Sequence, residues 1–283
     1  MDYFLLRCQH DGAIRWALQT QDETRLLPDS FQFSQWLAGS TEDVQVHIDT
    51  LTQSAAEAIP TPEALLAPVD AQEIWASGVT YLRSRDARQE EAQDGGDVYA
   101  RVYHAQRPEL FFKSLAYKAV GQGDAVGIRQ DATWNVPEPE LALVLNPAMQ
   151  VIGFTIGNDM SSRDIEGENP LYLPQAKVYD KSCALGPRIW LNPANAWPDV
   201  TIAITISRSD EVVFQAETNT GQIKRTLPEL ASYLGRSHTL DYGALLLTGT
   251  GVVPPSDFTL QAGDVVSITI EPIGTLTNTV TVV

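Results

Sequence analysis

Hydrophobic and polar residues alternate along this chain in a way that predicts mainly β-strands. Three isoleucines at positions 202, 204 and 206 are separated by small or hydroxylated residues, which is the period of a half-buried strand. Apolar runs at residues 140–145 and 151–156 predict buried strands. Residues 265–270 and 280–283 predict two closing strands, joined by a turn at Pro272-Ile273-Gly274.

The first 70 residues have the pattern of a small separate unit. Apolar residues 4–6 and 14–18 flank Asp11-Gly12, which predicts a β-hairpin. Asp29-Ser30 precedes an apolar stretch at residues 31–37, which predicts a short helix capped from in front. Prolines at positions 60, 62 and 68 indicate a boundary. We therefore expect a small N-terminal α+β domain at residues 1–70 and a larger domain at residues 71–283.

One helix is clearly predicted in the larger domain. Thr226-Leu-Pro-Glu229 has the spacing of a capping box, and Leu227, Leu230, Tyr233 and Leu234 give an apolar face. Strands do not alternate with helices often enough for a doubly wound sheet, so the expected class is α+β, mostly β. No glycine-rich phosphate motif occurs, which argues against a nucleotide cofactor.

Charge narrows the classes of partner. The 283 residues include 36 acidic and 19 basic side chains, for a net charge of −17, which argues against binding nucleic acid or an anionic membrane. No apolar run is long enough for a transmembrane helix, and the first residues lack the basic and apolar regions of a signal peptide. Cys8 and Cys183 match no metal or redox spacing, so we expect two reduced thiols in a cytoplasmic protein.

Three carboxylates are the first candidates for chemistry. Glu138 and Glu140 are two residues apart at the start of an apolar strand, so they face the same side. The following strand ends at Asn158-Asp159, and pairing of these strands would bring Asp159 to the two glutamates. The E-x-E pattern alone is also typical of a solvated strand edge, but the third carboxylate favours a site for a hard divalent ion such as Mg²⁺.

A basic candidate follows. Residues 159–170 mix charged residues with Ser, Asn and Gly, which predicts a loop. Lys177 comes after the apolar Leu171-Tyr-Leu-Pro174, where partial desolvation would lower its pKa towards that of a useful base. The alternative is a lysine whose stem lies on the surface with its amine in water.

Several motifs occur together and in a fixed order. They are Pro108-Glu-Leu-Phe-Phe-Lys113, Glu138-Pro-Glu140-Leu, Gly157-Asn-Asp-Met-Ser-Ser-Arg-Asp164, Lys177-Val-Tyr-Asp180, Thr248-Gly-Thr250 and Gly263-Asp264. In these motifs the chain, over residues 73–283, resembles the fumarylacetoacetate hydrolase family. The segments Gly78-Val-Thr-Tyr81-Leu-Arg-Ser-Arg85 and Ile165 to Lys177 resemble its 2-keto-3-deoxy-D-arabinonate dehydratase branch.

The resemblance implies a fold and roles for individual residues. The implied fold is a mixed β-sandwich or roll behind a small N-terminal domain, in a homodimer or larger homo-oligomer. The implied metal ligands are Glu138, Glu140 and Asp159, which would hold Mg²⁺, with Mn²⁺ or Ca²⁺ as alternatives. The other implied residues are Lys177 and Glu109 as catalytic groups, and Arg163, Thr250, Tyr81 and Arg83 as substrate contacts.

One departure favours elimination over hydrolysis. The C–C hydrolases of this family carry a His–Glu pair that activates water, and here Ser84 and Ala87 occupy those positions. Loss of such a general base typically costs about 10²–10⁴-fold in rate, whereas elimination needs no activated water. His104 lies near Glu109 in sequence and is either a substitute base or an ordinary loop histidine.

We therefore expect a Mg²⁺-dependent dehydratase that converts 2-keto-3-deoxy-D-arabinonate to 2,5-dioxopentanoate. The metal would chelate the carboxylate and keto oxygens of a small anionic 2-keto acid, acidify its C3 protons and stabilise the enolate. Lys177 would be the base, and Glu109 the acid for the C4 hydroxyl, kept protonated by an apolar setting that Phe111 and Phe112 could provide.

Some alternatives remain open on the sequence. They are a C–C hydrolase of an acylpyruvate or fumarylpyruvate-type acid, a keto-acid decarboxylase or tautomerase, and a non-catalytic binding module. The arginines at positions 83, 85 and 88 either belong to a lid that admits anions or form a solvated helix face with Glu90 and Glu91.

Overall fold

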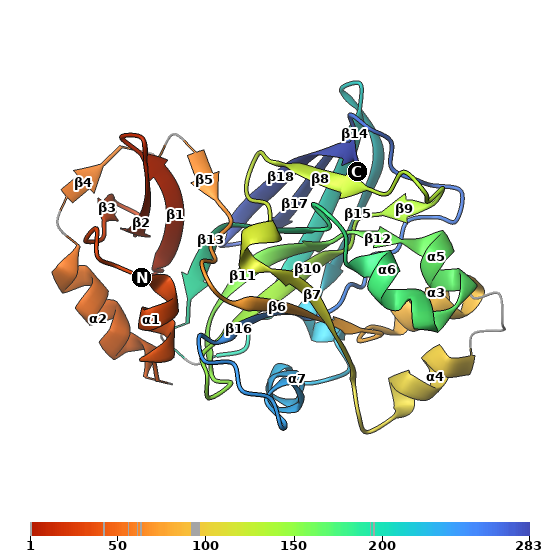
Figure 1. The fold of residues 1–283 in the computed structure, drawn as a ribbon, viewed down its shortest axis with the longest axis horizontal. Coiled ribbons are helices and arrows are strands. Elements are labelled where there is room, and N and C mark those ends of the chain that lie inside the picture. The colour runs from red at the N-terminus through yellow and green to blue at the C-terminus, as the bar shows by residue number, and fades with distance from the viewer. Residues whose placement is uncertain are drawn as a thin grey trace.

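The computed structural model describes residues 2–283 except 42, 56, 61, 63, 92–96, 193 and 195 (Figure 1). Within the described residues, eleven strands form one mixed sheet in the order β4-β3-β2-β1-β13-β11-β10-β16-β6-β7, with β5 beside β1. They are β1 (Phe4–His10), β2 (Ala13–Gln19), β3 (Thr24–Leu26), β4 (Glu57–Ile59), β5 (Ala64–Leu66), β6 (Glu73–Gly78), β7 (Glu109–Leu115), β10 (Pro139–Leu145), β11 (Val151–Asp159), β13 (Cys183–Leu191) and β16 (Ala244–Leu247).

A second sheet covers part of the first. Its order is β15-β14-β17-β18-β8, and its strands are β8 (Ala125–Ile128), β14 (Thr201–Arg208), β15 (Glu211–Asn219), β17 (Val265–Ile270) and β18 (Gly274–Val282). The short strands β9 (Asn135–Val136) and β12 (Ser161–Ser162) pair with each other beside it. Most neighbouring strands are antiparallel, but β16 pairs with β6 and β18 with β8 in parallel. The predicted mostly-β, sandwich-like architecture is therefore confirmed.

Helices lie outside the two sheets. The α-helices are α1 (Phe33–Ala38), α2 (Val44–Ser54), α3 (Leu82–Glu91), α4 (Asp97–His104), α5 (Arg163–Glu168), α6 (Leu173–Lys177) and α7 (Leu227–Leu234), with 3-10 turns at Ala116–Lys118, Pro170–Tyr172 and Thr220–Gln222. In Figure 1, α1 and α2 accompany the N-terminal strands, whereas α3, α5 and α6 gather at the opposite end of the molecule. No helix among the described residues has both the length and the apolar character that crossing a membrane requires.

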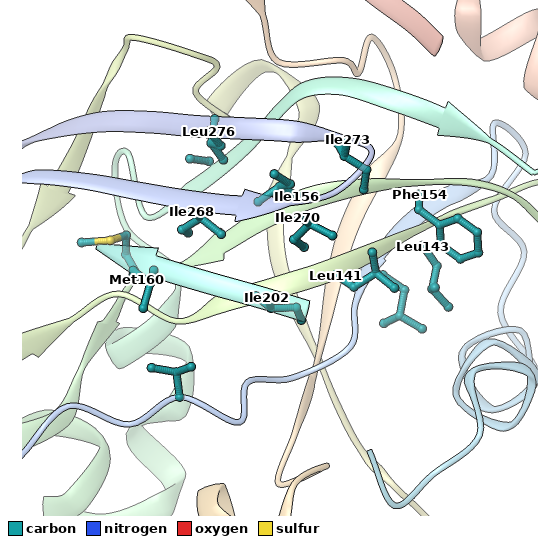
Figure 2. Packing of buried hydrophobic residues seen from close by; sticks show 14 of the residues in the cluster. Leu141, Leu143, Phe154, Ile156, Met160, Ile202, Ile268, Ile270, Ile273 and Leu276 are labelled. Atoms are coloured by element: carbon teal, nitrogen blue, oxygen red, sulfur yellow. The ribbon is translucent and has the colours of Figure 1, made fainter. Parts of the chain in front are cut away.

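The larger core lies between the two sheets. Figure 2 shows Leu141 and Leu143 of β10 near Ile268 and Ile270 of β17. The intervening residues of β10, Ala142 and Val144, belong instead to a second core on the other face of the sheet. The strand is thus buried on both sides, which explains why the sequence shows a continuous apolar run there rather than alternation. On β14 only one face is buried, and the isoleucines alternate with partly exposed residues as predicted.

Local signals placed several other elements correctly. The hairpin β1–β2 turns at Asp11 and Gly12, which both have positive φ, as a two-residue type I′ turn requires. Helix α7 begins after Thr226, whose hydroxyl accepts the backbone N–H of Glu229. The strands predicted at 140–145, 151–156 and 265–270 are β10, β11 and β17.

Three local predictions were wrong. Residues 163–168 form α5 rather than a loop, with Asp164 and Glu166 in its first turn, where carboxylates favour a helix N-terminus. Helix α1 has no side-chain cap from the residues before it, because Asp70, distant in sequence, accepts the backbone N–H of Ser34 at 3.1 Å. The last strand begins at Gly274 rather than at residue 280, because it pairs with β17 immediately after the turn.

The N-terminal residues share the large sheet with the rest of the chain. Strand β1 pairs with β13 through Phe4↔Trp190 and Leu5↔Ile189. The second core also combines residues of α1 and α2 with residues of β10 and β13. The division into residues 1–70 and 71–283 therefore stays a prediction about domains, within one continuous sheet.

Candidate active site

Three carboxylates meet where β10 begins and β11 ends. The strands pair antiparallel with Pro139 opposite Asn158, which places Glu138 opposite Asp159, and the Asp159 N–H donates to the Glu138 carbonyl at 3.0 Å. Glu140 lies two residues along the same strand, so it shares the face of Glu138. All three side chains are buried, and one oxygen of each lies within 4.8 Å of the others. The predicted convergence of these side chains is confirmed.

Two buried lysines contact this trio. The Lys177 Nζ lies 2.7 Å from Glu138 Oε2 and 3.2 Å from Asp159 Oδ2. The Lys113 Nζ lies 2.5 Å from Asp159 Oδ1, and it also donates to the backbone carbonyls of Met160 at 3.0 Å and Lys177 at 2.5 Å. Lys113 therefore fixes both the Asp159 carboxylate and the backbone that carries Lys177.

Two arginines hold the remaining oxygen of Glu138. The Glu138 Oε1 atom lies 2.6 Å from Arg88 Nη2 and 2.9 Å from Arg163 Nη2. The same two arginines contact Oε2 of Glu91, at 3.1 and 2.8 Å. A third acid, Glu166, accepts from Arg88 Nε at 2.9 Å. This closed network ties α3 and α5 to the start of β10, and it leaves each buried charge with a partner.

Burial and the neighbouring charges perturb the titration of this cluster. Burial, reinforced by Asp159 and Glu138, raises the pKa of Glu140 well above its ordinary value. Burial alone would lower the pKa of Lys177, but the carboxylates of Asp159, Glu138 and Glu166 outweigh it and raise that pKa. The predicted lowering of the Lys177 pKa by desolvation is therefore wrong for the metal-free chain, because the sequence pattern did not reveal how close these carboxylates lie.

The donor set fits a hard divalent cation. Three buried carboxylate oxygens converge, and burial together with mutual repulsion raises the pKa of Glu140 and so favours its protonated form. A cation among them would relieve that repulsion, and Mg²⁺ prefers a few carboxylate oxygens and keeps some of its waters. Gly249 completes the arrangement, because its N–H donates to Glu140 Oε2 at 2.5 Å.

A cavity opens beside the carboxylates. Its walls bring together residues from six helices and strands and from three loops: Ser77, Gly78, Val79, Ser84, Arg88, Glu109, Phe111, Glu138, Asp159, Glu166, Leu173, Lys177 and Thr250. The predicted base Lys177, the predicted acid Glu109 and two of the predicted metal ligands thus share one space. These side chains come from positions up to 173 residues apart in the sequence.

Glu109 occupies a special place in this cavity. It begins β7 opposite Gly78 of β6, and a Cβ on Gly78 would lie only 2.1 Å from Glu109 Oε2. Burial and the charge of Glu166 raise the pKa of Glu109 to about 7, against the opposing effect of Arg88 and Lys177. Phe111 lies on the same face and lines the cavity, whereas Phe112 faces the other way and packs edge-to-face on Trp75. Of the two expected aromatic neighbours, only Phe111 therefore contributes to the cavity wall.

The other predicted substrate contacts lie in different settings. Thr250 lines the cavity. Tyr81 is buried, and its hydroxyl has no hydrogen-bond partner among the residues that the structure describes; burial and the charge of Glu140 raise its pKa. Arg163 is held by Glu138 and Glu91 and is not one of the lining residues. Arg83 is 52% exposed and faces Glu90 on the outside of α3, so its predicted contact has no support in the geometry.

Sequence reasoning missed several residues of the site. Glu166 and Lys113 were assigned no role, and Arg88 and Glu91 were expected only in a lid or a solvated helix face. His104, at the exposed end of α4, is not a lining residue. One signal could have identified Arg88: Ser84, Arg88 and Glu91 repeat at helical spacing, so they share one face of α3. This face of α3 points into the protein, whereas Arg83 points into solvent. The arginines of α3 therefore form neither a wholly solvated face nor a wholly buried one.

Known proteins resemble this chain over most of its length. The family model described as Fumarylacetoacetate (FAA) hydrolase C-terminal matches residues 73–281. A protein of Haloferax volcanii named "Probable 2-keto-3-deoxyxylonate dehydratase" is 51% identical over 218 residues, covering 76% of this chain and 74% of the relative. The 2-dehydro-3-deoxy-D-arabinonate dehydratase of Saccharolobus solfataricus is 42% identical over 213 residues, covering 74% of this chain and 72% of the relative.

A solved structure also superposes on the whole chain. It is a 2-keto-3-deoxy-D-arabinonate dehydratase complexed with magnesium and 2,5-dioxopentanoate, with a TM-score of 0.85 and 31% sequence identity. The match covers 100% of this chain and 99% of that chain.

Proposed function

The chain belongs to the fumarylacetoacetate hydrolase family, and from this premise we propose that it is a Mg²⁺-dependent dehydratase of a 2-keto-3-deoxy sugar acid. The relatives that cover about three quarters of it are named as dehydratases of the arabinonate and xylonate forms of such acids. The proposed reaction converts 2-keto-3-deoxy-D-arabinonate to 2,5-dioxopentanoate with loss of water. The observation that carries the proposal is one cavity lined by Lys177, Glu109 and two members of the converging carboxylate trio, Glu138 and Asp159.

Glu138, Glu140 and Asp159 would hold the metal. When bound there, Mg²⁺ supplies Lewis-acid polarisation of the substrate's keto group, which acidifies the protons at C3. Mn²⁺ and Ca²⁺ accept the same oxygen ligands. Arg88 and Arg163 keep Oε1 of Glu138 occupied, so its Oε2 is the oxygen left to face the site beside Lys177.

Lys177 is the proposed base at C3. The carboxylates that raise the pKa of Lys177 include two proposed metal ligands, Glu138 and Asp159. They therefore stabilise the ammonium form of Lys177 most strongly when no metal ion is bound between them. Lys113 holds the Lys177 carbonyl and so fixes the backbone from which the amine extends. As Lys177 takes a C3 proton, the electron pair forms the C3–C4 double bond and the C4 hydroxyl departs.

Glu109 is the proposed acid for that hydroxyl. With a pKa of about 7, a substantial fraction of its carboxyl carries a proton near neutrality, and it can pass that proton to the departing oxygen, which leaves as water. Tautomerisation of the resulting unsaturated product gives the 2,5-dioxo acid. The acid–base pair needs no activated water. Ser84 lines the cavity at the position where the hydrolases carry a histidine, and it does not replace that histidine as a base that activates water.

A direct assay tests the proposal. The purified chain is stripped with a chelator and assayed on a panel of five- and six-carbon 2-keto-3-deoxy acids with and without Mg²⁺, and NMR identifies the products. We expect Mg²⁺-dependent loss of water with an unchanged carbon count. Full activity in the metal-free protein would refute the metal's role, and release of pyruvate would instead establish the C–C hydrolase alternative.

The oligomeric state and the cellular location complete the proposal. We propose a homodimer or larger homo-oligomer, because Val212 and Val213 are 58% and 41% exposed on β15, an edge strand of the second sheet. Light scattering coupled to gel filtration measures that state. We also propose a cytoplasmic location, which fits the two buried, unpaired cysteines Cys8 and Cys183.

A further inference from the structure

The cavity offers an incoming anion little free positive charge. Among the described lining residues, four are acidic, namely Glu109, Glu138, Asp159 and Glu166, and two are basic, Arg88 and Lys177. Lys177 already contacts two carboxylates, and Arg88 contacts three, through Nε, Nη1 and Nη2. Neither cation can therefore bind a further carboxylate without giving up a buried partner, which is strongly unfavourable.

Glu166 adds a negative charge to the cavity wall and is not one of the three proposed metal ligands. Its Oε1 accepts from Arg88 Nε at 2.9 Å, and its Oε2 accepts from Ser161 Oγ at 3.2 Å. Although burial alone would raise the pKa of Glu166, Arg88 and Lys177 hold it below its ordinary value, so the side chain is ionised at neutral pH. An ionised carboxylate only accepts hydrogen bonds, and two of the roughly four lone-pair sites on its oxygens have partners here.

The place of Glu166 in the cavity indicates that it faces the end of the substrate remote from the keto-acid group. Glu109 and Glu166 both line the cavity, and the charge of Glu166 raises the pKa of Glu109, so the two carboxyl groups lie close enough to interact. In the proposed function, the metal trio binds the substrate's keto-acid end and Glu109 acts at C4. The group beyond C4 therefore extends towards the part of the wall that Glu109 and Glu166 share.

We propose that Glu166 is a specificity-determining residue that excludes a second carboxylate, so that the cavity accepts 2-keto acids with one carboxylate and an uncharged, hydroxylated tail. This inference rests on the proposed function, because that function sets the direction in which the substrate lies. A tail hydroxyl can donate a hydrogen bond to Glu166, whereas a tail carboxylate has no proton to donate and meets a like charge. The chain would thus discriminate against the dicarboxylic keto acids by repulsion as well as by fit.

Two five-carbon probes isolate this effect. 2-Oxopentanoate and 2-oxoglutarate share the keto-acid end and the chain length, and they differ only in a terminal methyl against a terminal carboxylate. Calorimetry with Mg²⁺ present measures the affinity of the full chain for each acid. We expect the wild-type chain to bind 2-oxopentanoate at least tenfold more tightly, a difference of about 1.4 kcal/mol.

Substitutions then test the role of Glu166. Glu166→Gln removes the negative charge and leaves Arg88 with one neutral partner, so we expect the two affinities to come within about threefold or to reverse, a change of at least 0.7 kcal/mol by the same conversion. Glu166→Asp keeps the charge and should keep the preference. Glu90→Gln is the matched control, because it removes one negative charge from a glutamate that is 69% exposed on the outside of α3, and it should leave the ratio unchanged.

The outcomes separate the two claims. Equal or tighter binding of 2-oxoglutarate by the wild-type chain would overturn the inference. This test needs no variant, so the inference can be refuted even if Glu166→Gln does not fold. An unchanged ratio in a folded Glu166→Gln would overturn it as well, while leaving the proposed function intact. If neither acid binds in a Mg²⁺-dependent way, the proposed function fails and this inference fails with it.

Discussion

Gly78 provides the space in which the carboxyl group of Glu109 lies, so a single methyl group there tests the role of Glu109. In Gly78→Ala, the new Cβ would lie 2.1 Å from Glu109 Oε2 and 2.4 Å from its Cδ. Gly78 is not one of the residues with positive φ, so the strand backbone accommodates alanine without strain. The atoms in the way belong to the end of a flexible side chain, so the carboxyl group moves and the fold does not.

The size of that movement sets the expected loss. Ordinary contacts to a Cβ begin near 3.4 Å, so the Glu109 carboxyl must shift by about 1 Å or rotate away. A misplacement of about 1 Å in a reacting group can cost about 10²-fold in rate, and general acid catalysis as a whole is worth about 10²–10⁴-fold. We therefore expect kcat to fall by about 10²-fold, with a small change in KM, because the proposed metal ligands are untouched.

Steady-state dehydration kinetics and thermal melts of four variants, namely Gly78→Ala, Gly39→Ala, Glu109→Gln and a double variant, check this reasoning. Gly39→Ala is the matched control, because its Cβ would have no neighbour closer than 3.6 Å and it lies at the end of α1, outside the cavity. In the double variant of Gly78→Ala and Glu109→Gln, kcat should equal that of Glu109→Gln alone, since both changes remove the same acid. Near-wild-type kcat in Gly78→Ala, or losses that multiply in the double variant, would refute the proposed role of Glu109.

Three further predictions concern the charged residues of the site. Lys177→Met should lower kcat by about 10²–10⁴-fold while Mn²⁺ binding, followed by electron paramagnetic resonance, persists; near-wild-type turnover would remove Lys177 from its role. Because the folded pKa of Glu109 is raised from 4.5 to about 7, the metal-free wild type should lose about 3 kcal/mol from this group as pH rises through that window. Urea unfolding at pH 5 and pH 8 measures the free energy of unfolding, and Glu109→Gln should lack this loss. An equal change in that free energy between the two pH values for both proteins would contradict the raised pKa of Glu109. Arg88→Ala should destabilise the chain by about 3–5 kcal/mol because it takes the arginine away from the buried Glu166 carboxylate, whereas Arg83→Ala should change stability by less than about 0.5 kcal/mol in thermal melts. Similar effects of the two variants would contradict the inward and outward placement of these arginines.

The sequence by itself determined the features that depend on short-range periodicity. A strand turns successive side chains to opposite faces, so the spacing of Glu138 and Glu140 was enough to place both carboxylates on one side. The apolar runs identified β10, β11 and β17, and the Thr226 cap identified α7, because these signals are contained within a few consecutive residues. The motif order likewise identified the family before any contact was known.

Only the tertiary structure decided which charges meet. Lys177 lies 39 residues from Glu138 in sequence and 2.7 Å from it in space, and this proximity reversed the expected direction of its pKa shift. The same holds for the arginines of α3: packing against α5 and β10 turned Arg88 inward and left Arg83 in solvent. Electrostatic energies depend on distance and burial, which are set by strand register and helix packing across the whole chain, so no local pattern could supply them.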